Sequence, residues 1–164
     1  MIGSEWPTAE LDRIARLRVL AAGLPGVVLR ERTIDTPFDR VWAFVSDFER
    51  SVPAFDADVA SLKIRHREGD RLRIVARGSW RLLRVPLAFD VDVHPGWCLM
   101  VSRPRLYVVG MAAEPDGDRT RFGHLEGVVG DTRYLGPVLA LTRVRHRRHV
   151  THDLDGIERE LGLG

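Results

Sequence analysis

The sequence predicts a single α+β domain, in which an antiparallel sheet occupies the middle of the chain and helices precede and follow it. Between residues 58 and 129, apolar and polar residues alternate with a period of two, which is typical of strands. Turn signals rich in glycine, proline and aspartate divide this region at spacings that fit consecutive hairpins. Helical periodicity lies on either side of it. At 164 residues, the chain has the size of one ordinary domain.

The first third of the chain predicts a helix, a strand and two short helices. A helix is expected from about Thr8 to Ala22, because apolar residues recur there at helical spacing and glycine and proline at 23–26 stop it. A strand follows over Val27–Ile34. Pro37 then opens a second helix with one apolar stripe, and a third short helix or turn covers Phe48–Phe55.

The middle and last thirds predict about six strands and one long helix. The clearest alternation runs from Leu83 to Val93 and places six apolar side chains on one face, as in a half-solvated antiparallel strand. Pro86 lacks a backbone N–H and therefore favours an edge strand or a bulge. A terminal helix is expected from about Asp131 to Leu161, with an apolar stripe made of Leu139, Val150, Leu154, Ile157 and Leu161.

Composition excludes several classes of function. The formal net charge of +2 is too small to predict nucleic-acid binding, so no DNA partner is expected. One cysteine, Cys98, supplies neither a disulfide framework nor a cysteine zinc motif. No secretory signal and no apolar run of about 20 residues is found, so we expect a soluble cytoplasmic protein.

The segment from Thr33 to Arg50, TIDTPFDRVWAFVSDFER, resembles the SRPBCC or START-like superfamily. The hairpin Pro115–Phe122, PDGDRTRF, resembles the penultimate turn and last strand of that superfamily. Two shorter segments, Ser46–Arg50 and Arg67–Asp70, are most similar to its bacterial polyketide aromatase/cyclase branch. The resemblance begins near Val27, so we expect an N-terminal helical extension over 1–26 and a START-like ligand-binding domain over 27–164.

The resemblance implies a helix-grip fold, in which a curved antiparallel sheet of about seven strands surrounds the long C-terminal helix. Sheet and helix in such a fold can leave an apolar cavity between them. The N-terminal extension would pack on the outer face of the sheet or contact a partner. Ring hydroxylases of the superfamily need an iron site of two histidines and one carboxylate, and the sequence shows no convincing set of this kind. No cofactor is therefore expected.

Two residues of the expected last strand are candidates for catalysis. His124 and Glu126 share a face with Phe122 by the period of two, and the resemblance implies that Phe122 points inward. An imidazole and a carboxylate in a semi-apolar pocket tune each other's protonation. Acid/base catalysis requires groups whose protonation is tuned in this way, for example to enolise a β-ketone for an aldol cyclisation. The alternatives are a reversed face or a hydrogen-bonded pair in the core.

The strands and the last helix supply the expected walls of the cavity, although ordinary core packing explains the aromatic residues equally well. Arg143 or Arg147 would hold an anionic group of the ligand, unless both keep their charged ends in water. We expect the pocket to be lined by Leu72, Ile74, Trp80, Leu87, Phe89, Val91, Trp97, Tyr107, Phe122, Leu139, Arg143 and Arg147.

The terminal helix carries two further patterns. His146, His149 and Asp153 share a helical face, but this spacing is common by accident and no fourth ligand is evident, so no metal is expected. The basic tract 143–149 is best explained as a solvated face, offset by acidic residues that include Asp153 and Asp155. Docking of this tract on an acidic membrane or a ribosome is the other interpretation.

Three hypotheses of function follow. The first is binding of a small hydrophobic molecule, lipid-like or polycyclic, in an internal cavity. The second is a polyketide aromatase/cyclase that uses His124 and Glu126 as acid and base. The third is an interaction module that docks on a membrane or ribosome through the basic tract.

Overall fold

The computed structural model describes residues 10–79, 86–129 and 136–163, with the backbone alone described over 136–144. Its elements follow the predicted order of helix, strand, two short helices, six strands and a long helix. They are α1 (Arg13–Gly23), β1 (Val27–Ile34), α2 (Phe38–Val45), α3 (Phe48–Phe55), β2 (Val59–Glu68), β3 (Arg71–Gly78), β4 (Leu87–His94), β5 (Trp97–Arg103), β6 (Tyr107–Asp116), β7 (Arg119–Val128) and α4 (Gly136–Glu160).

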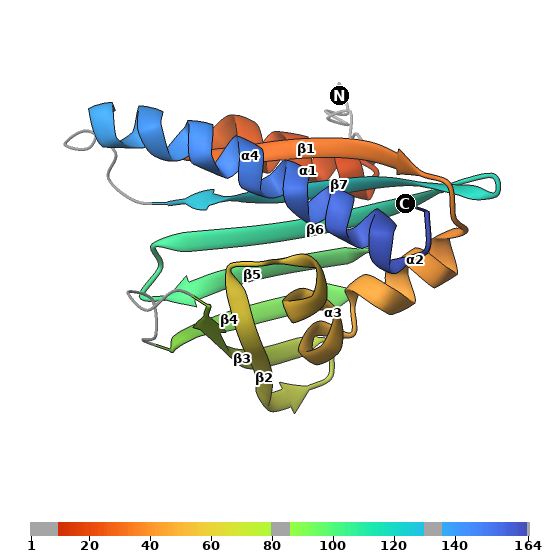
Figure 1. Cartoon of the computed structure of the whole chain (residues 1–164), viewed down its shortest axis with the longest axis horizontal. Helices are drawn as coiled ribbons and strands as arrows, with labels where there is room; N and C mark the ends of the chain where they lie inside the picture. Colours follow the sequence, from red (N-terminus) through yellow and green to blue (C-terminus); the bar gives the residue numbers. More distant parts are fainter. Residues whose placement is uncertain (1–9, 80–85, 130–135, 164) are drawn as a thin grey trace, which may run out of the picture.

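The strands form one antiparallel sheet of seven strands in the order β1-β7-β6-β5-β4-β3-β2 (Figure 1). Strands β2 to β7 are a meander, and β1 closes it by pairing with β7. The predicted turns contain glycines in the left-handed region, as at Gly69 (φ 57°) and Gly117 (φ 62°), a conformation that other residues adopt at a cost. The α+β class and the helix-grip arrangement are confirmed.

The sheet is covered on both faces. Helix α4 crosses one face (Figure 1), and the larger hydrophobic core lies on that side, together with side chains of α2 and α3. Helix α1 packs against the opposite face of β1, β6 and β7, where a second core forms around Ile14 and Leu17. Packing on the outer face was one of the two roles that we expected for the N-terminal extension.

Helix α1 is shorter than the sequence predicts. It begins at Arg13, because the carboxylate of Asp12 accepts a hydrogen bond from the backbone N–H of Ala15 at 2.6 Å and caps the first turn. Residues 10–12 are not helical, and residues 1–9 lie outside the described residues. The helix approaches the sheet closely where Gly110 and Gly123 face it, since a Cβ on either would lie 2.9 or 3.2 Å from the Leu17 side chain.

The prediction from Pro86 was wrong. Strand β4 pairs with both β3 and β5, so it is an interior strand. Pro86 is the residue before the first residue of β4, where no ladder N–H is needed. The predicted strand begins at Leu83, and its first three residues, 83–85, lie outside the described residues.

Helix α4 is described over Gly136–Glu160, and its predicted start near Asp131 lies outside the described residues. Four residues of its predicted stripe, Val150, Leu154, Ile157 and Leu161, are buried in the structure. The fifth, Leu139, has a side chain outside the described residues. Among the described residues, no helix is long and apolar enough to cross a membrane.

Candidate functional site

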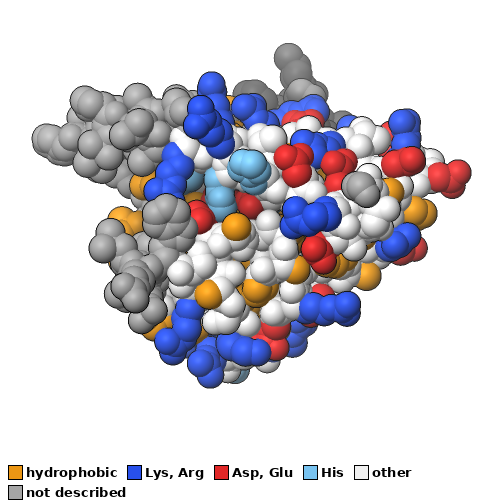
Figure 2. Space-filling view, viewed as in Figure 1, with side chains coloured by type: hydrophobic (Ala, Val, Ile, Leu, Met, Phe, Trp, Pro, Cys, Tyr) orange, Lys and Arg blue, Asp and Glu red, His pale blue; other side chains and the backbone are white. Residues whose placement is uncertain are grey.

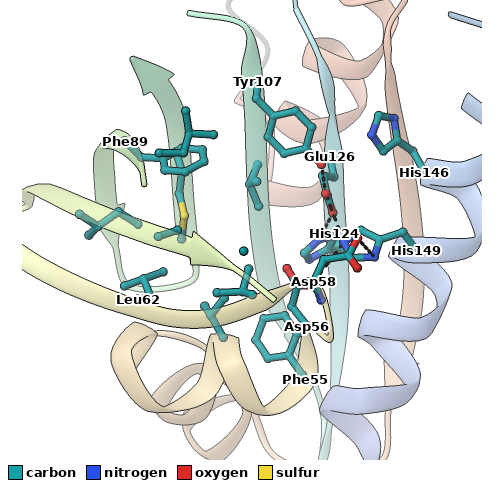
Figure 3. Close-up of a pocket in the computed structure, with 18 of the residues that line it drawn as sticks. Phe55, Asp56, Asp58, Leu62, Phe89, Tyr107, His124, Glu126, His146 and His149 are labelled. Atoms are coloured by element: carbon teal, nitrogen blue, oxygen red, sulfur yellow. Dashed lines mark hydrogen bonds and ion pairs between the residues drawn. The ribbon is translucent and has the colours of Figure 1, made fainter. Parts of the chain in front are cut away.

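A cavity of about 480 Å³ lies between the sheet, α3 and α4. Strands β2 to β7 supply its wall on one side, and Val52 and Phe55 of α3 and three residues of α4 close the other. Most of its lining is apolar. The polar side chains gather where β7 approaches α4 (Figure 3).

The structure brings six of the predicted site residues to this cavity. Ile74, Leu87, Phe89 and Tyr107 line it from β3, β4 and β6. His124 and Glu126 line it from β7, so both face inward together with Phe122. The orientation that the period of two left open is therefore settled for this strand.

Three other predicted lining residues face the same side of the sheet without lining the cavity. Leu72, Val91 and Phe122 lie in the larger core, where neighbouring side chains cover them. They support the cavity as core residues.

Trp97 and Arg147 are placed elsewhere. Trp97 packs on the second core beside α1, because Cys98 and Met100, its neighbours in the alternation of β5, take the inward positions. Arg147 is exposed, which keeps its guanidinium in water. The remaining predicted residues, Trp80, Leu139 and Arg143, lie outside the residues whose side chains are described.

A buried polar cluster lies at the α4 end of the cavity and consists of Asp56, His124, Glu126, His149 and Asp153. Nε2 of His124 lies 3.4 Å from Oε2 of Glu126 and 3.5 Å from Oδ2 of Asp153. Nε2 of His149 lies 3.3 Å from Oε1 of Glu126 and 3.6 Å from Oδ2 of Asp153. The two histidines thus contact the same two carboxylates, those of Glu126 and Asp153.

Further polar groups surround the cluster. Oδ1 of Asp56 lies 3.6 Å from Nε2 of His149, and Oδ2 of Asp58 lies 3.7 Å from Nδ1 of the same ring. The hydroxyl of Tyr107 donates a hydrogen bond to Oε1 of Glu126. The Tyr107 ring meets the ring of His146 edge-on, with centroids 5.8 Å apart.

Burial and neighbouring charges shift the protonation of the histidines in opposite directions. Burial lowers the pKa of His124 to about 3, helped by the charge of His149, so the His124 ring is neutral. Burial by itself lowers the pKa of His149, but the hydrogen bond to Glu126 and the surrounding carboxylates raise it to about 10. Burial also lowers the pKa of His146.

Two carboxyl groups of the cluster, those of Asp56 and Asp153, have pKa values shifted toward the neutral form. Burial raises the pKa of Asp56 to about 6, against the opposing effect of His149. Burial and the charges of Asp56 and Glu126 raise the pKa of Asp153 well above its usual range. The cluster therefore holds fewer charges than its residue types suggest.

Some buried atoms of the cluster lack a hydrogen-bond partner among the described residues. They are Oδ2 of Asp153 and Nδ1 of His124. Beside the cluster, Nδ1 of His146 also lacks a partner. Unsatisfied buried groups of this kind are costly, and several within one site point to a missing partner such as water, a ligand or an ion.

The sequence interpretation placed Asp153 wrongly. It assigned this residue to a solvated acidic face, whereas Asp153 is 1% exposed and points toward β7. The helical position of Asp153 could have predicted its burial. Asp153 follows His149 by four residues, on the same face of the helix, and precedes Leu154 of the buried stripe. Within the basic tract, Arg145, His146 and His149 line the cavity, whereas Arg147 and Arg148 are exposed and do not line it.

The sequence interpretation did not identify Asp56 at all. This residue follows the last residue of α3 and reaches the cluster only because α3 packs against α4. At the contact, Gly156 of α4 lies so close to α3 that a Cβ on it would be 2.7 Å from the carbonyl oxygen of Phe55. Gly156 therefore sets the distance between the two helices.

We expect Gly156→Ala to lower the free energy of unfolding by about 1–3 kcal/mol, because the added methyl group has to push α3 away from α4. Chemical denaturation measures this change. His152→Ala, at an exposed position on the same helix, is the control. Equal stability of Gly156→Ala and the wild type would contradict the close contact.

Comparison with known proteins supports the fold. No protein-family model matches the sequence, and no curated protein does. Solved structures do match. TTHA0849 from Thermus thermophilus is 22% identical with a TM-score of 0.66, over 81% of this chain and 94% of that one. The Zhui aromatase/cyclase from a Streptomyces species is 16% identical with a TM-score of 0.63, over 82% of this chain and 92% of that one.

A third match is the solution structure of the 18 kDa protein CC1736 from Caulobacter crescentus, at 15% identity and a TM-score of 0.61. It covers 82% of this chain and 94% of that one. At these identities the comparisons concern the arrangement of the chain in space. The protein therefore shares the helix-grip fold of these solved structures, the fold that the sequence resemblance implied.

Proposed function

We propose that the protein binds a small hydrophobic molecule, lipid-like or polycyclic, in the cavity between the sheet and α4. The observation that carries this proposal is a largely apolar cavity of about 480 Å³ that ends in a polar cluster. Cavities of roughly 300–1,000 Å³ with an apolar lining and a few polar groups are typical of ligand sites.

The arrangement of the lining indicates the orientation of the ligand. Phe55, Leu62, Ile74 and Phe89 would contact its apolar body, and the polar groups on β6, β7 and α4 would contact oxygen functions at one end. Histidine and acidic side chains also meet at the surface beside α4 in Figure 2, so the polar end of the cavity lies near solvent. A molecule with one apolar and one oxygenated end suits this lining best.

A substitution that fills the cavity tests the proposal. Ala76 lines the cavity from β3, whereas the preceding residue, Val75, lies on the other face of the strand. We expect Ala76→Phe to reduce binding of an apolar fluorescent probe at least 10-fold, because the phenyl ring occupies the space of the ligand. Val75→Phe should bind as the wild type does.

The measurement is a fluorescence titration, accompanied by native mass spectrometry of the freshly purified protein. Equal binding by Ala76→Phe and the wild type, with both proteins folded, would overturn the proposal. A retained molecule of a few hundred daltons, lost in Ala76→Phe alone, would support it and identify the class of ligand.

A second proposed function is aldol cyclisation of a poly-β-ketone, as in an aromatase/cyclase. The observation in its favour is that His124 and Glu126 both face the cavity, which could hold such a chain. Neutral His124 would hydrogen-bond a substrate carbonyl, and Glu126 would take the proton from the carbon between two carbonyls. Unchanged cyclisation by Glu126→Gln would exclude this role.

A further inference from the structure

We infer that three residues of the buried polar cluster bind one divalent transition-metal ion at the wall of the cavity: His124 and Glu126 from β7 and Asp153 from α4. One ligand atom from each of the three lies within 4.8 Å of the others. All three side chains are almost completely buried. The inference goes beyond ligand binding and does not depend on the identity of the cavity ligand.

The distances within this triad fit metal ligands better than hydrogen bonds. Nε2 of His124 lies 3.4 Å from Glu126 and 3.5 Å from Asp153. A well-formed N–H···O hydrogen bond measures about 2.7–3.2 Å. Two ligands that each lie about 2.0–2.2 Å from one ion in tetrahedral geometry are separated by about 3.3–3.6 Å. The observed spacings lie in that range.

An unpartnered atom points to the same place. Oδ2 is the oxygen of Asp153 that faces Nε2 of His124, and it accepts no hydrogen bond among the described residues. Asp153 is only 1% exposed, so solvent does not readily satisfy it. An ion bound at the triad would coordinate this oxygen and offset the cost of burying a carboxylate beside a second one.

Groups behind the triad extend the site. Nε2 of His149 contacts both Glu126 and Asp153, at 3.3 and 3.6 Å, and adds a second imidazole once the incoming ion displaces the proton of the ring. Oδ2 of Asp58 lies behind the His149 ring, 3.7 Å from Nδ1. A carboxylate behind a histidine ring is a common way in which proteins orient a metal ligand. His149 is 15% exposed, which places the site close to solvent and gives an ion a short path inward.

The donor set defines the class of ion. Imidazole and carboxylate together suit zinc, iron, cobalt or manganese in the divalent state, whereas calcium and magnesium prefer oxygen alone. His124 and Glu126 also line the cavity, so an open coordination position would face the bound molecule. Three protein ligands and one open position are typical of metal sites that contact a substrate.

The ligands come from elements with little freedom to move. His124 and Glu126 lie two residues apart on β7, which pairs with both β1 and β6 and is covered on both faces. Asp153 lies on α4, which the glycine contact holds close to α3. A rigid scaffold of this kind presents its ligands in one geometry.

The test is a titration of chelator-treated protein with Zn²⁺ by calorimetry and with Co²⁺ by visible absorption. We expect one ion per chain, Co²⁺ bands of a four- or five-coordinate site, and a higher unfolding temperature with Zn²⁺. His124→Ala and Asp153→Asn should weaken binding by at least about 100-fold, because each removes a ligand. His152→Ala, next to Asp153 but exposed, should bind as the wild type does.

The outcomes separate this inference from adventitious surface binding. Exposed His94 lies 3.0 Å from Asp70 and 3.2 Å from Asp92, and such a group can bind Zn²⁺ weakly. Absence of stoichiometric binding, or binding that survives in both triad variants, would overturn the inference. Circular dichroism confirms that the variants are folded. Binding of the apolar probe by metal-free protein is measured separately, so either proposal can fail alone.

Discussion

Leu17→Ala is expected to lower the free energy of unfolding by about 2–5 kcal/mol, as large-to-small changes in a core do. Leu17 is completely buried between α1 and the sheet, and its δ carbons occupy the space left by Gly110 and Gly123. The space is bordered by backbone, so it cannot collapse easily around an alanine. The loss should therefore lie in the upper part of this range.

Urea denaturation followed by circular dichroism measures the effect. Val19→Ala is the matched control, because Val19 lies on the same helix and is 59% exposed. A change below about 1 kcal/mol for Leu17→Ala would show that α1 is only loosely attached to the sheet, since exposed positions usually change stability by less than that.

Phe122→Ala should have a comparable or larger effect, with a loss of about 3–5 kcal/mol. Phe122 lies on β7 in the larger core and is completely buried, and no part of its ring faces the cavity. Removal of the ring leaves a new void, and the neighbouring residues on β7 are held by strand pairing on both sides.

Phe89→Ala provides the comparison for this prediction. Phe89 also lies in the larger core, but its ring lines the existing cavity and has fewer atoms packed against it. Phe89→Ala should therefore cost less stability than Phe122→Ala and weaken binding of the apolar probe more. The reverse order of stability in thermal or urea unfolding would mean that the cavity wall is assigned wrongly.

Local patterns were sufficient to predict most of the fold. The bounds of β1 and α3 agree with the sequence prediction, because apolar spacing, proline and glycine act over a few residues. The order of elements then restricts the possible architectures to a small number. The resemblance in the segment from Thr33 to Arg50 selected the helix-grip arrangement among them.

Sequence patterns were less informative where both faces of a strand are buried. In β5, residues at both phases are apolar, so the alternation does not show that Trp97 faces α1 and Met100 faces the cavity. The same uncertainty affected β7. There, the resemblance and not the period of two indicated that His124 and Glu126 point inward.

The polar cluster depends on contacts between distant parts of the chain. Asp56 and Asp153 meet only after α3 packs on α4, and no local pattern reports that contact. An aspartate on a charged helix is ordinarily solvated, so Asp153 was assigned to the surface. Its position beside Leu154 on the buried stripe was the better guide.

Helix α1 has a consequence for how the sequence can vary. It makes the sheet the middle of three layers over β1, β7 and β6, whereas the arginine- and aspartate-bearing face of β3 and β4 remains exposed. In β7, then, substitutions at successive positions from Phe122 to Gly127 all meet packed neighbours, and tolerance to mutation should be low over this stretch. In β3 and β4 every second position is free to change. Changes at these outer positions leave the cavity-facing side chains of β3 and β4 untouched, whereas a change in the part of β7 that carries His124 and Glu126 disturbs packing on either face.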